Sequence, residues 1–394
     1  MHTVGTSPNG AQITGCGGGA GAGAVPSTGV GCVSQNFVRE DKETIVVALG
    51  GNAILQPKQQ GTCEAQYANV AETARYIAHM VLDGYRVVVT HGNGPQVGNI
   101  LIQNEEGRGT VPAMPLDVCG AESQGQIGYW IQQALGNELR AAGCGQPVVT
   151  LVTQVVVDAD DPAFTNPTKP VGPFYTDRRA QRLMAEKGYV MKEVGPAGWR
   201  RVVPSPEPRA IVERDAIVRL IADGAIVISC GGGGIPVRPI RPMAGLTAGG
   251  DGGAYTGVEA VIDKDLAGQR LATEVGADTF LILTDVEKVA LNFGRPDQED
   301  LDRLTVDQAR GYMKEGHFRA GSMGPKVEAA VRFVEAGGRR AIITSLHKAL
   351  QALRDEAGTL VVGVESGDAG RPGGYRDGPV AEKMKVNAFS CIKS

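Results

Sequence analysis

The sequence predicts an α/β fold in which helices cover both faces of a mainly parallel sheet. Short runs of Val, Ile and Leu alternate with longer stretches of helical periodicity, which is typical of strand–helix–strand units. The runs are almost continuously apolar, as strands buried on both faces should be. Three of them end in glycine-rich turns, so we expect a ligand site at the carboxyl ends of the strands.

Six strands and two marked helices carry this prediction. The strands are expected at residues 45–49, 87–90, 148–157, 225–229, 279–284 and 341–344. Apolar residues recur every four positions over 127–139, with Ser123 as the expected N-cap of that helix. Valines repeat over 327–334, and Pro325 suits the first turn of that helix.

The chain divides into a predicted body and two tails. Residues 1–42 are rich in glycine and alanine, so we expect a disordered tail, and 365–394 form a C-terminal extension. The body, 43–364, is long enough for one large α/β domain. Within it, the proline-rich and polar segment 158–208 is expected to protrude as a lid, and 238–257 to form a surface loop.

Composition excludes several classes of partner. The net charge of −4 gives no basic field for nucleic acid or an anionic membrane. No apolar run approaches the length that spans a bilayer. The seven cysteines are scattered, without zinc-like spacing or a disulfide framework, which is typical of reduced thiols. We therefore expect a cytoplasmic protein without a nucleic-acid or membrane partner.

The glycine turns carry the first functional prediction. They are Gly50-Gly51-Asn52, His91-Gly92-Asn93-Gly94 and the four glycines from Gly231 to Gly234. A strand that ends in glycine lets backbone N–H groups approach an anion without a side chain in the way. No Walker lysine pattern is present, and no acidic residue follows at the spacing of a dinucleotide site. The turns therefore predict a phosphate site of another kind, in which His91 orients its turn.

Two lysines, Lys326 and Lys264, strengthen the prediction of a phosphate site. Lys326 falls in the first turn of a predicted helix, where a cation opposes the helix dipole by roughly 0.3–1 kcal/mol. Lys264 lies at another strand-to-helix junction, and either Asp263 or Asp265 could cap that helix. Lys169 lies in the lid, in Pro-Thr-Lys-Pro. Lys264 or Lys326 alone could be merely solvated, but both lysines together with the three glycine turns favour a phosphate site, where phosphoryl transfer needs positive charge. On composition alone, Lys169 is interpreted as an exposed loop lysine.

Ordered motifs in the body resemble those of carbamate kinases, within the amino-acid kinase superfamily. The motifs are residues 48–53, 90–98, 112–117, 161–164 with 167–170, 259–265 and 321–328. The resemblance implies a three-layer α/β/α sandwich around a mainly parallel eight-stranded sheet, with a protruding lid subdomain. It also implies a homodimer. The implied reaction is reversible transfer of the γ-phosphoryl group of ATP, with Mg²⁺, to carbamate, giving ADP and carbamoyl phosphate. Such enzymes often run towards ATP during arginine breakdown.

The resemblance also implies roles for individual residues. The catalytic residues would be Lys169, Lys264, Lys326 and Asp265. Carbamate and the transferred phosphoryl group would bind at Gly50, Gly51, Asn52, Gly92 and Asn93. ATP would bind at Gly231, Gly232, Asp285, Met323 and Lys326. Two alternatives remain: a related kinase with another acceptor, such as glutamate, N-acetylglutamate or UMP, and a nucleotide-binding module without catalysis.

Overall fold

The computed structural model describes residues 43–240, 253–318 and 321–363. The two tails expected at 1–42 and 365–394 lie outside these ranges. The described part of the chain begins at Glu43. Within the described residues, no helix has both the length and the apolar character needed to cross a bilayer.

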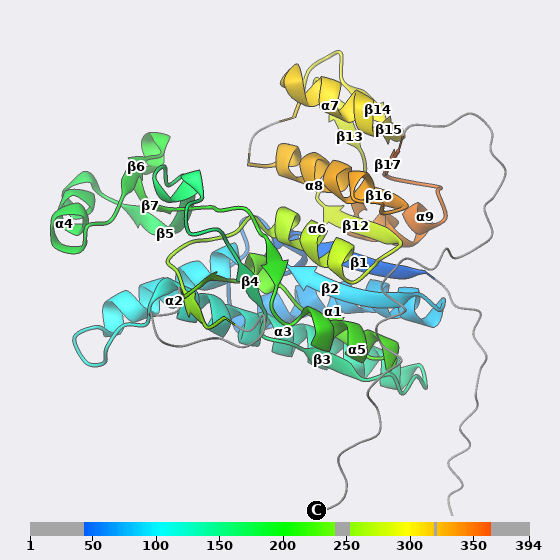
Figure 1. Ribbon diagram of the computed structural model, residues 1–394, viewed down its shortest axis with the longest axis horizontal. Helices are drawn as coiled ribbons and strands as arrows, with labels where there is room; N and C mark the ends of the chain where they lie inside the picture. The colour runs from blue at the N-terminus through cyan, green and yellow to red at the C-terminus, as the bar shows by residue number, and fades with distance from the viewer. Residues whose placement is uncertain (1–42, 241–252, 319–320, 364–394) are drawn as a thin grey trace, which may run out of the picture. The chain divides into compact units, whose positions relative to one another are not determined.

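The centre of the fold is a sheet of eight strands in the order β15-β17-β16-β12-β1-β2-β9-β3 (Figure 1). Its strands are β1 (Thr44–Leu49), β2 (Arg86–His91), β3 (Val148–Thr150), β9 (Ile226–Ile228), β12 (Thr279–Thr284), β15 (Arg303–Thr305), β16 (Arg340–Ser345) and β17 (Thr359–Val362). All neighbours pair in parallel except β16 and β17. The predicted mainly parallel eight-stranded sheet is confirmed.

Helices cover both faces of this sheet. One face carries α1 (Cys63–Leu82), α3 (Leu116–Ala141) and α9 (Ala349–Leu353); the other carries α5 (Arg214–Ala222), α6 (Lys264–Glu274), α7 (Val306–Lys314) and α8 (Met323–Glu335). Successive residues of β1 face opposite layers. Val46 and Ala48 belong to the α6–α8 core, whereas Ile45 and Val47 belong to the α1–α3 core. The three-layer prediction is therefore confirmed.

The remaining elements of the body are short. They are α2 (Gly94–Gly107), the hairpin β13 (Val289–Leu291) and β14 (Glu299–Leu301), and the 3₁₀ turns η1 (Gly51–Ala53), η2 (Pro162–Phe164), η3 (Gly195–Ala197), η4 (Gly231–Gly233) and η5 (Leu346–Lys348). A second sheet has the strand order β11-β10-β4-β8, from β4 (Gln154–Val156), β8 (Ala210–Ile211), β10 (Ile235–Pro239) and β11 (Tyr255–Gly257).

The single strand expected at 148–157 is wrong, because the chain changes sheets inside it. Strand β3 ends at Thr150, and β4 joins the second sheet. The break has a clear cause in α3. The Gln124 side chain accepts from the Thr153 N–H at 2.8 Å and donates to the Thr153 carbonyl at 3.2 Å. These bonds satisfy the N–H and carbonyl groups of Thr153 where the backbone leaves the central sheet.

Two other expectations are corrected and one is confirmed. Ser123 is not an N-cap, because α3 begins at Leu116 and Ser123 lies buried inside it. The loop expected at 238–257 begins and ends in the antiparallel pair β10–β11, and its residues 241–252 lie outside the described ranges. Pro325 lies in the first turn of α8, as predicted.

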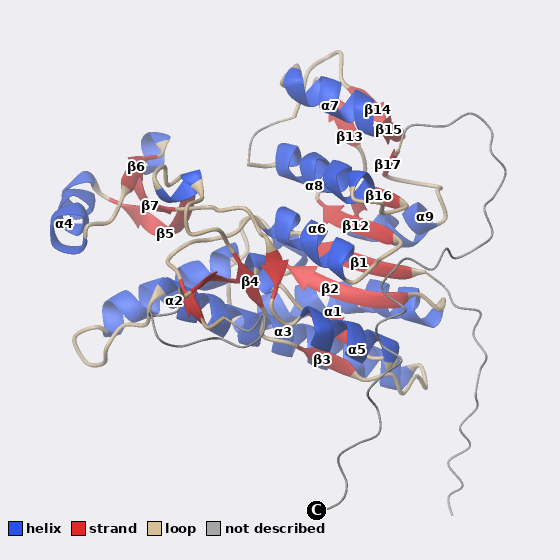
Figure 2. Ribbon diagram, viewed as in Figure 1, coloured by secondary structure: helices blue, strands red, loops and turns tan. Residues whose placement is uncertain are grey.

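The lid segment forms its own small sheet with a helix, separate from the central sheet in Figure 2. It contains β5 (Lys169–Tyr175), α4 (Asp177–Lys187), β6 (Met191–Glu193) and β7 (Trp199–Val203), with strand order β5-β7-β6. Two ion pairs of 2.5 Å anchor it to the body: Arg179 contacts Glu105 of α2, and Arg201 contacts Glu259. Buried Val171 and Val203 also pack against α2 and α3.

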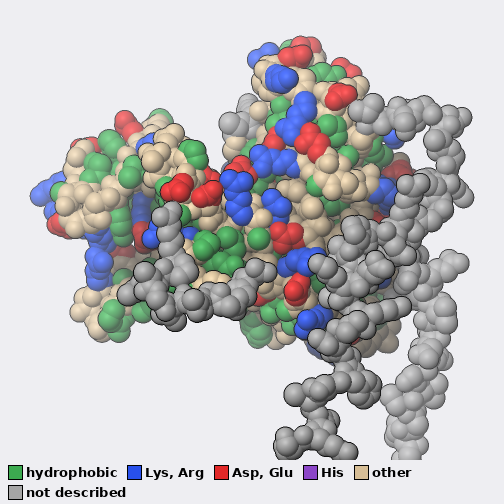
Figure 3. All heavy atoms as spheres, viewed as in Figure 1, with side chains coloured by type: hydrophobic (Ala, Val, Ile, Leu, Met, Phe, Trp, Pro, Cys, Tyr) green, Lys and Arg blue, Asp and Glu red, His purple; other side chains and the backbone are tan. Residues whose placement is uncertain are grey.

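Basic and acidic side chains lie beside one another over α6 and α8 on the face shown in Figure 3. Arg332 of α8 contacts Glu328 one turn earlier and Glu207 near the end of the lid segment, at 2.5 and 2.7 Å. Arg310 of α7 also contacts Glu328, at 2.5 Å. This network joins both helices to the segment in which the chain returns from the lid.

Candidate active site

A cleft of about 770 Å³ opens where β1, β2 and β12 end, beside the lid. Its walls hold the predicted residues Gly50, Gly51, Asn52, Gly92, Asn93, Lys169, Gly232, Lys264, Asp265, Asp285 and Lys326. Segments far apart in the sequence thus meet in one place, as parallel strands with glycine turns require. Of the predicted residues, Gly231 and Met323 do not line this cleft.

The first glycine turn approaches the neighbouring strand closely. A Cβ on Gly50 would lie 2.8 Å from the carbonyl oxygen of Leu283 in β12, a separation that real Cβ atoms do not show. Gly51 has open space on its Cβ side and begins η1. The first N–H groups of a helical turn lack partners within the turn. The sequence therefore places free donors at the cleft wall.

The second turn and the tetraglycine pack against each other. A Cβ on Gly231 would lie 2.4 Å from Nε2 of His91, and one on Gly232 would lie 2.1 Å from Nδ2 of Asn93. Asn93 is the N-cap residue of α2 and donates from Nδ2 to Oγ of Ser123 at 2.7 Å. The absence of side chains at Gly231 and Gly232 thus leaves the space that His91 and Asn93 occupy. Ser123 orients the Asn93 amide.

His91 is buried beneath the cleft as a neutral ring. Burial lowers its pKa from 6.5 to about 4; the Gly92 carbonyl opposes this shift, and Lys264 adds to it. The Nδ1 atom lies 2.9 Å from that carbonyl, so the neutral ring donates from Nδ1. This contact supports the interpretation that His91 orients its turn.

His91 should make the fold acid-sensitive. Its folded pKa lies below its unfolded value, so only the unfolded chain takes up this proton as the pH falls from 6.5 towards 4. We expect this residue to remove about 2 kcal/mol of unfolding free energy between pH 6.5 and 5. Urea unfolding at both pH values, in wild type and His91→Asn, measures the difference. An equal loss in both proteins would contradict the assignment.

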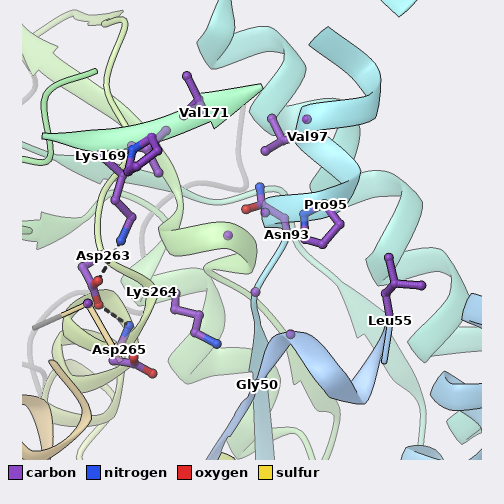
Figure 4. Close-up of a pocket in the computed structure, with 18 of the residues that line it drawn as sticks. Gly50, Leu55, Asn93, Pro95, Val97, Lys169, Val171, Asp263, Lys264 and Asp265 are labelled. Atoms are coloured by element: carbon purple, nitrogen blue, oxygen red, sulfur yellow. Dashed lines mark hydrogen bonds and ion pairs between the residues drawn. The ribbon is translucent and has the colours of Figure 1, made fainter. Parts of the chain in front are cut away.

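The three lysines converge on the cleft but differ in their partners. Lys169 contacts Asp263 at 2.9 Å, and Lys326 contacts Asp265 at 3.0 Å. Among the described residues, Lys264 has no hydrogen-bond or ion-pair partner, and Figure 4 shows it extending from α6 towards the glycine turns. Burial lowers the Lys264 pKa, with Asp265 opposing the shift and Lys326 adding to it. An unpaired, desolvated ammonium beside N–H donors is a site prepared for an anion.

The structure shows which of the two carboxylates caps α6. Asp263 is the N-cap, and its Oδ1 accepts from the Asp265 N–H at 2.9 Å. Asp265 is buried inside the first turn, where its carboxylate holds Lys326. The sequence therefore supplied both candidates for the cap, and the structure separates their tasks.

Two cleft residues were missed by sequence reasoning. Asp263 was considered only as a cap, although its Oδ2 accepts the Lys169 ammonium. Arg200 of β7 also lines the cleft; it donates to the Gly172 carbonyl at 2.8 Å and lies over the Phe174 ring. An arginine in a short strand carries no sequence signal that separates it from a surface residue.

Comparison with known proteins shows the family of the chain. The sequence matches the amino acid kinase family over residues 43–345. It is 56% identical to carbamate kinase of Thermococcus kodakarensis over 321 residues, which cover 81% of this chain and 98% of that protein. Carbamate kinase of Pyrococcus furiosus is 54% identical over 320 residues, which cover 81% of this chain and 98% of that protein.

A solved structure gives the same result. Carbamate kinase from Giardia lamblia bound to AMP-PNP is 46% identical and matches with a TM-score of 0.76, over 82% of this chain and 99% of that one. Identity at this level across almost the whole length of the relatives covers all the cleft segments described above. The chain therefore belongs to the amino acid kinase family, as a member of its carbamate kinase branch.

Proposed function

We propose that this protein is a carbamate kinase that transfers the γ-phosphoryl group of ATP reversibly to carbamate. The observation that carries the proposal is Lys264, which has no hydrogen-bond or ion-pair partner among the described residues and extends towards two glycine turns (Figure 4). Carboxylates hold Lys169 and Lys326 at the same cleft. In the forward step, a carbamate oxygen bonds to the γ-phosphorus, and the bond from that phosphorus to the β–γ bridging oxygen breaks. ADP leaves with the electron pair.

The acceptor needs no general base, because carbamate is already an anion. The required help is positive charge around the transferred group and fixed positions for both substrates. Lys264, Lys326 and Lys169 supply the charge, and Asp265 orients Lys326. The turns at Gly50, Gly51 and Asn52 and at Gly92 and Asn93 supply donors to the phosphoryl group and to carbamate.

The nucleotide would lie on the β12 and α8 side of the cleft. Asp285 follows β12 and Met323 begins α8, next to Lys326 in the same turn. Gly232 lines the cleft, whereas Gly231 lies behind it against His91. Gly231 would therefore contribute to ATP binding only indirectly, by permitting the conformation of this turn. These ATP roles complete the proposed site.

Mg²⁺ would accompany the nucleotide and neutralise its phosphate oxygens. Asp263 and Asp265 are each paired with a lysine, whereas Asp285 is exposed and has no ion pair among the described residues. Carboxylate and phosphate oxygens are the ligands that Mg²⁺ prefers. Asp285 is therefore the side chain suited to contact the ion, with the phosphates providing the other ligands.

The proposal also covers the location, the oligomeric state and the domain bounds of the protein. We infer a cytoplasmic homodimer whose kinase domain is 43–364, with the tails outside the catalytic body. The thiols support this setting, because all four cysteines in the described part of the chain, Cys63, Cys119, Cys144 and Cys230, are free. In the cell we expect ATP formation from carbamoyl phosphate released during arginine breakdown.

An ATP-forming assay tests the proposal directly. Purified protein is mixed with ADP, Mg²⁺ and carbamoyl phosphate, and ATP is measured with luciferase. We expect ATP well above the uncatalysed background, and no such excess with Lys264→Met. Parallel reactions from ATP with glutamate, N-acetylglutamate or UMP test the related-kinase alternative. Turnover of one of those acceptors but not of carbamate, or nucleotide binding without turnover, would overturn the proposal.

A further inference from the structure

We propose that Asp263 is a positioning residue for the lid lysine, and that it fixes the Lys169 ammonium at the phosphoryl site through one carboxylate oxygen while the other caps α6. Its Oδ2 lies 2.9 Å from Nζ of Lys169, and its Oδ1 lies 2.9 Å from the Asp265 nitrogen. The inference rests on the proposed function, because the role of Lys169 is part of it.

The contact is sheltered from solvent. The side chain of Asp263 is 16% exposed and that of Lys169 is 35% exposed. Burial acts to raise the Asp263 pKa, but the Lys169 ammonium and the N–H groups of Asp265 and Leu266 outweigh it and lower the pKa. Asp263 is therefore a fixed anion at neutral pH, at the N-terminus of a helix that favours negative charge.

Within the described ranges, the other ion pairs between the lid and the body do not involve Lys169. The ion pairs Arg179–Glu105 and Arg201–Glu259 hold the lid to the body, but they lie on α4 and β7 and do not touch Lys169. A lysine ammonium ends a flexible four-carbon stem, so anchoring the strand does not fix the charge. Among the described residues, Asp263 is the partner that does so.

The geometry leaves Lys169 free to act on substrate. An ammonium has three N–H donors, and Asp263 uses one of them. The remaining donors can contact phosphoryl oxygens while the first bond persists. Figure 4 shows the Lys169 contact with Asp263 and the neighbouring Lys264. Asp265 holds Lys326 from the same helical turn, so the two carboxylates that flank Lys264 each hold one of the other two lysines.

A double-mutant cycle tests the inference. Asp263→Asn keeps an oxygen for the cap, since Asn is as good an N-cap as Asp, but removes the charge that holds Lys169. We expect kcat for ATP formation to fall by about ten- to a hundredfold with the KM for ADP little changed. In a Lys169→Met background, the same change should have almost no further effect. A loss of equal size in both backgrounds, or no loss in the single variant, would overturn the inference.

A matched control separates capping from positioning. Asp161 caps η2 in the same way, with Oδ1 accepting from the Ala163 nitrogen at 2.8 Å and Oδ2 accepting from the Glu207 nitrogen at 3.0 Å, but it has no lysine partner among the described residues. Asp161→Asn should therefore leave kcat near the wild-type value. A comparable loss would show that weakened caps, and not the placement of Lys169, reduce the rate.

A second readout does not depend on activity. The ligand-free proteins are treated briefly with acetic anhydride, and modification of Lys169 is quantified by mass spectrometry. We expect Lys169 to react severalfold faster in Asp263→Asn than in wild type or Asp161→Asn, because the carboxylate no longer holds the amine. Equal rates would overturn the inference. Absence of wild-type ATP formation would instead count against the proposed function.

Discussion

Changing Lys326 to methionine is expected to lower kcat by about a thousandfold, since it removes one of the cations that stabilise the transferred phosphoryl group. Its ammonium contacts Asp265 at 3.0 Å, and its side chain is only 12% exposed. Solvent therefore cannot readily compensate for the positive charge that the substitution removes. The luciferase assay under saturating substrates measures the change.

The fold should survive this substitution. Asp265 keeps Lys264 as a neighbouring cation and lies in the first turn of α6, where an anion is favoured. Lys314, an exposed lysine on α7 outside the cleft, provides the matched control Lys314→Met, which should retain kcat. Near-normal turnover in Lys326→Met, with the thermal unfolding midpoint unchanged, would show that this lysine is merely solvated.

Gly233→Ala is expected to lower the free energy of unfolding by at least about 3 kcal/mol. The residue has φ of +99°, which side chains disfavour, and an added Cβ would lie 2.4 Å from the carbonyl oxygen of Ile262. That oxygen belongs to backbone and cannot rotate away. Because Ile262 precedes Asp263, the displaced backbone should also lower kcat. Urea unfolding and the ATP-forming assay measure the two effects.

The control variant Gly276→Ala separates the effect of backbone strain from that of a steric clash. Gly276 also has a positive φ, +66°, but an added Cβ would meet nothing within 4 Å. Gly276→Ala should therefore cost only about 1 kcal/mol, the price of the backbone conformation. Equal destabilisation by both substitutions would contradict the assigned contact with Ile262.

The sequence predicts the central sheet well because its signal is local. The runs that became β1, β2, β9, β12 and β16 are apolar enough to show burial on both faces without knowledge of their partners. The segment at 148–157 reads as one strand for the same reason. Its break depends on Gln124, which lies in a helix and meets Thr153 only in the folded chain. Ser123 misleads similarly, because its partner Asn93 comes from another element.

In the candidate site too, the local signals are visible in the sequence and the contacts between distant residues are not. Glycine turns and lysines at helix starts are visible in the sequence because each breaks a local preference. Their pairing is not visible, since Lys169 meets Asp263 across 94 positions and Lys326 meets Asp265 across 61. Whether Asp263 or Asp265 caps α6 is likewise undecidable from two carboxylates that flank one lysine.

The parallel pairing of β1 with β12 has a consequence for how the protein folds. Ile45 to Leu49 pair with Thr279 to Leu283, so closing this ladder costs the entropy of a very long loop. Folding rates fall as contacts become less local. The first glycine turn gains its Leu283 neighbour only when that ladder forms, so the turn can reach its final shape only after the two halves of the chain have joined.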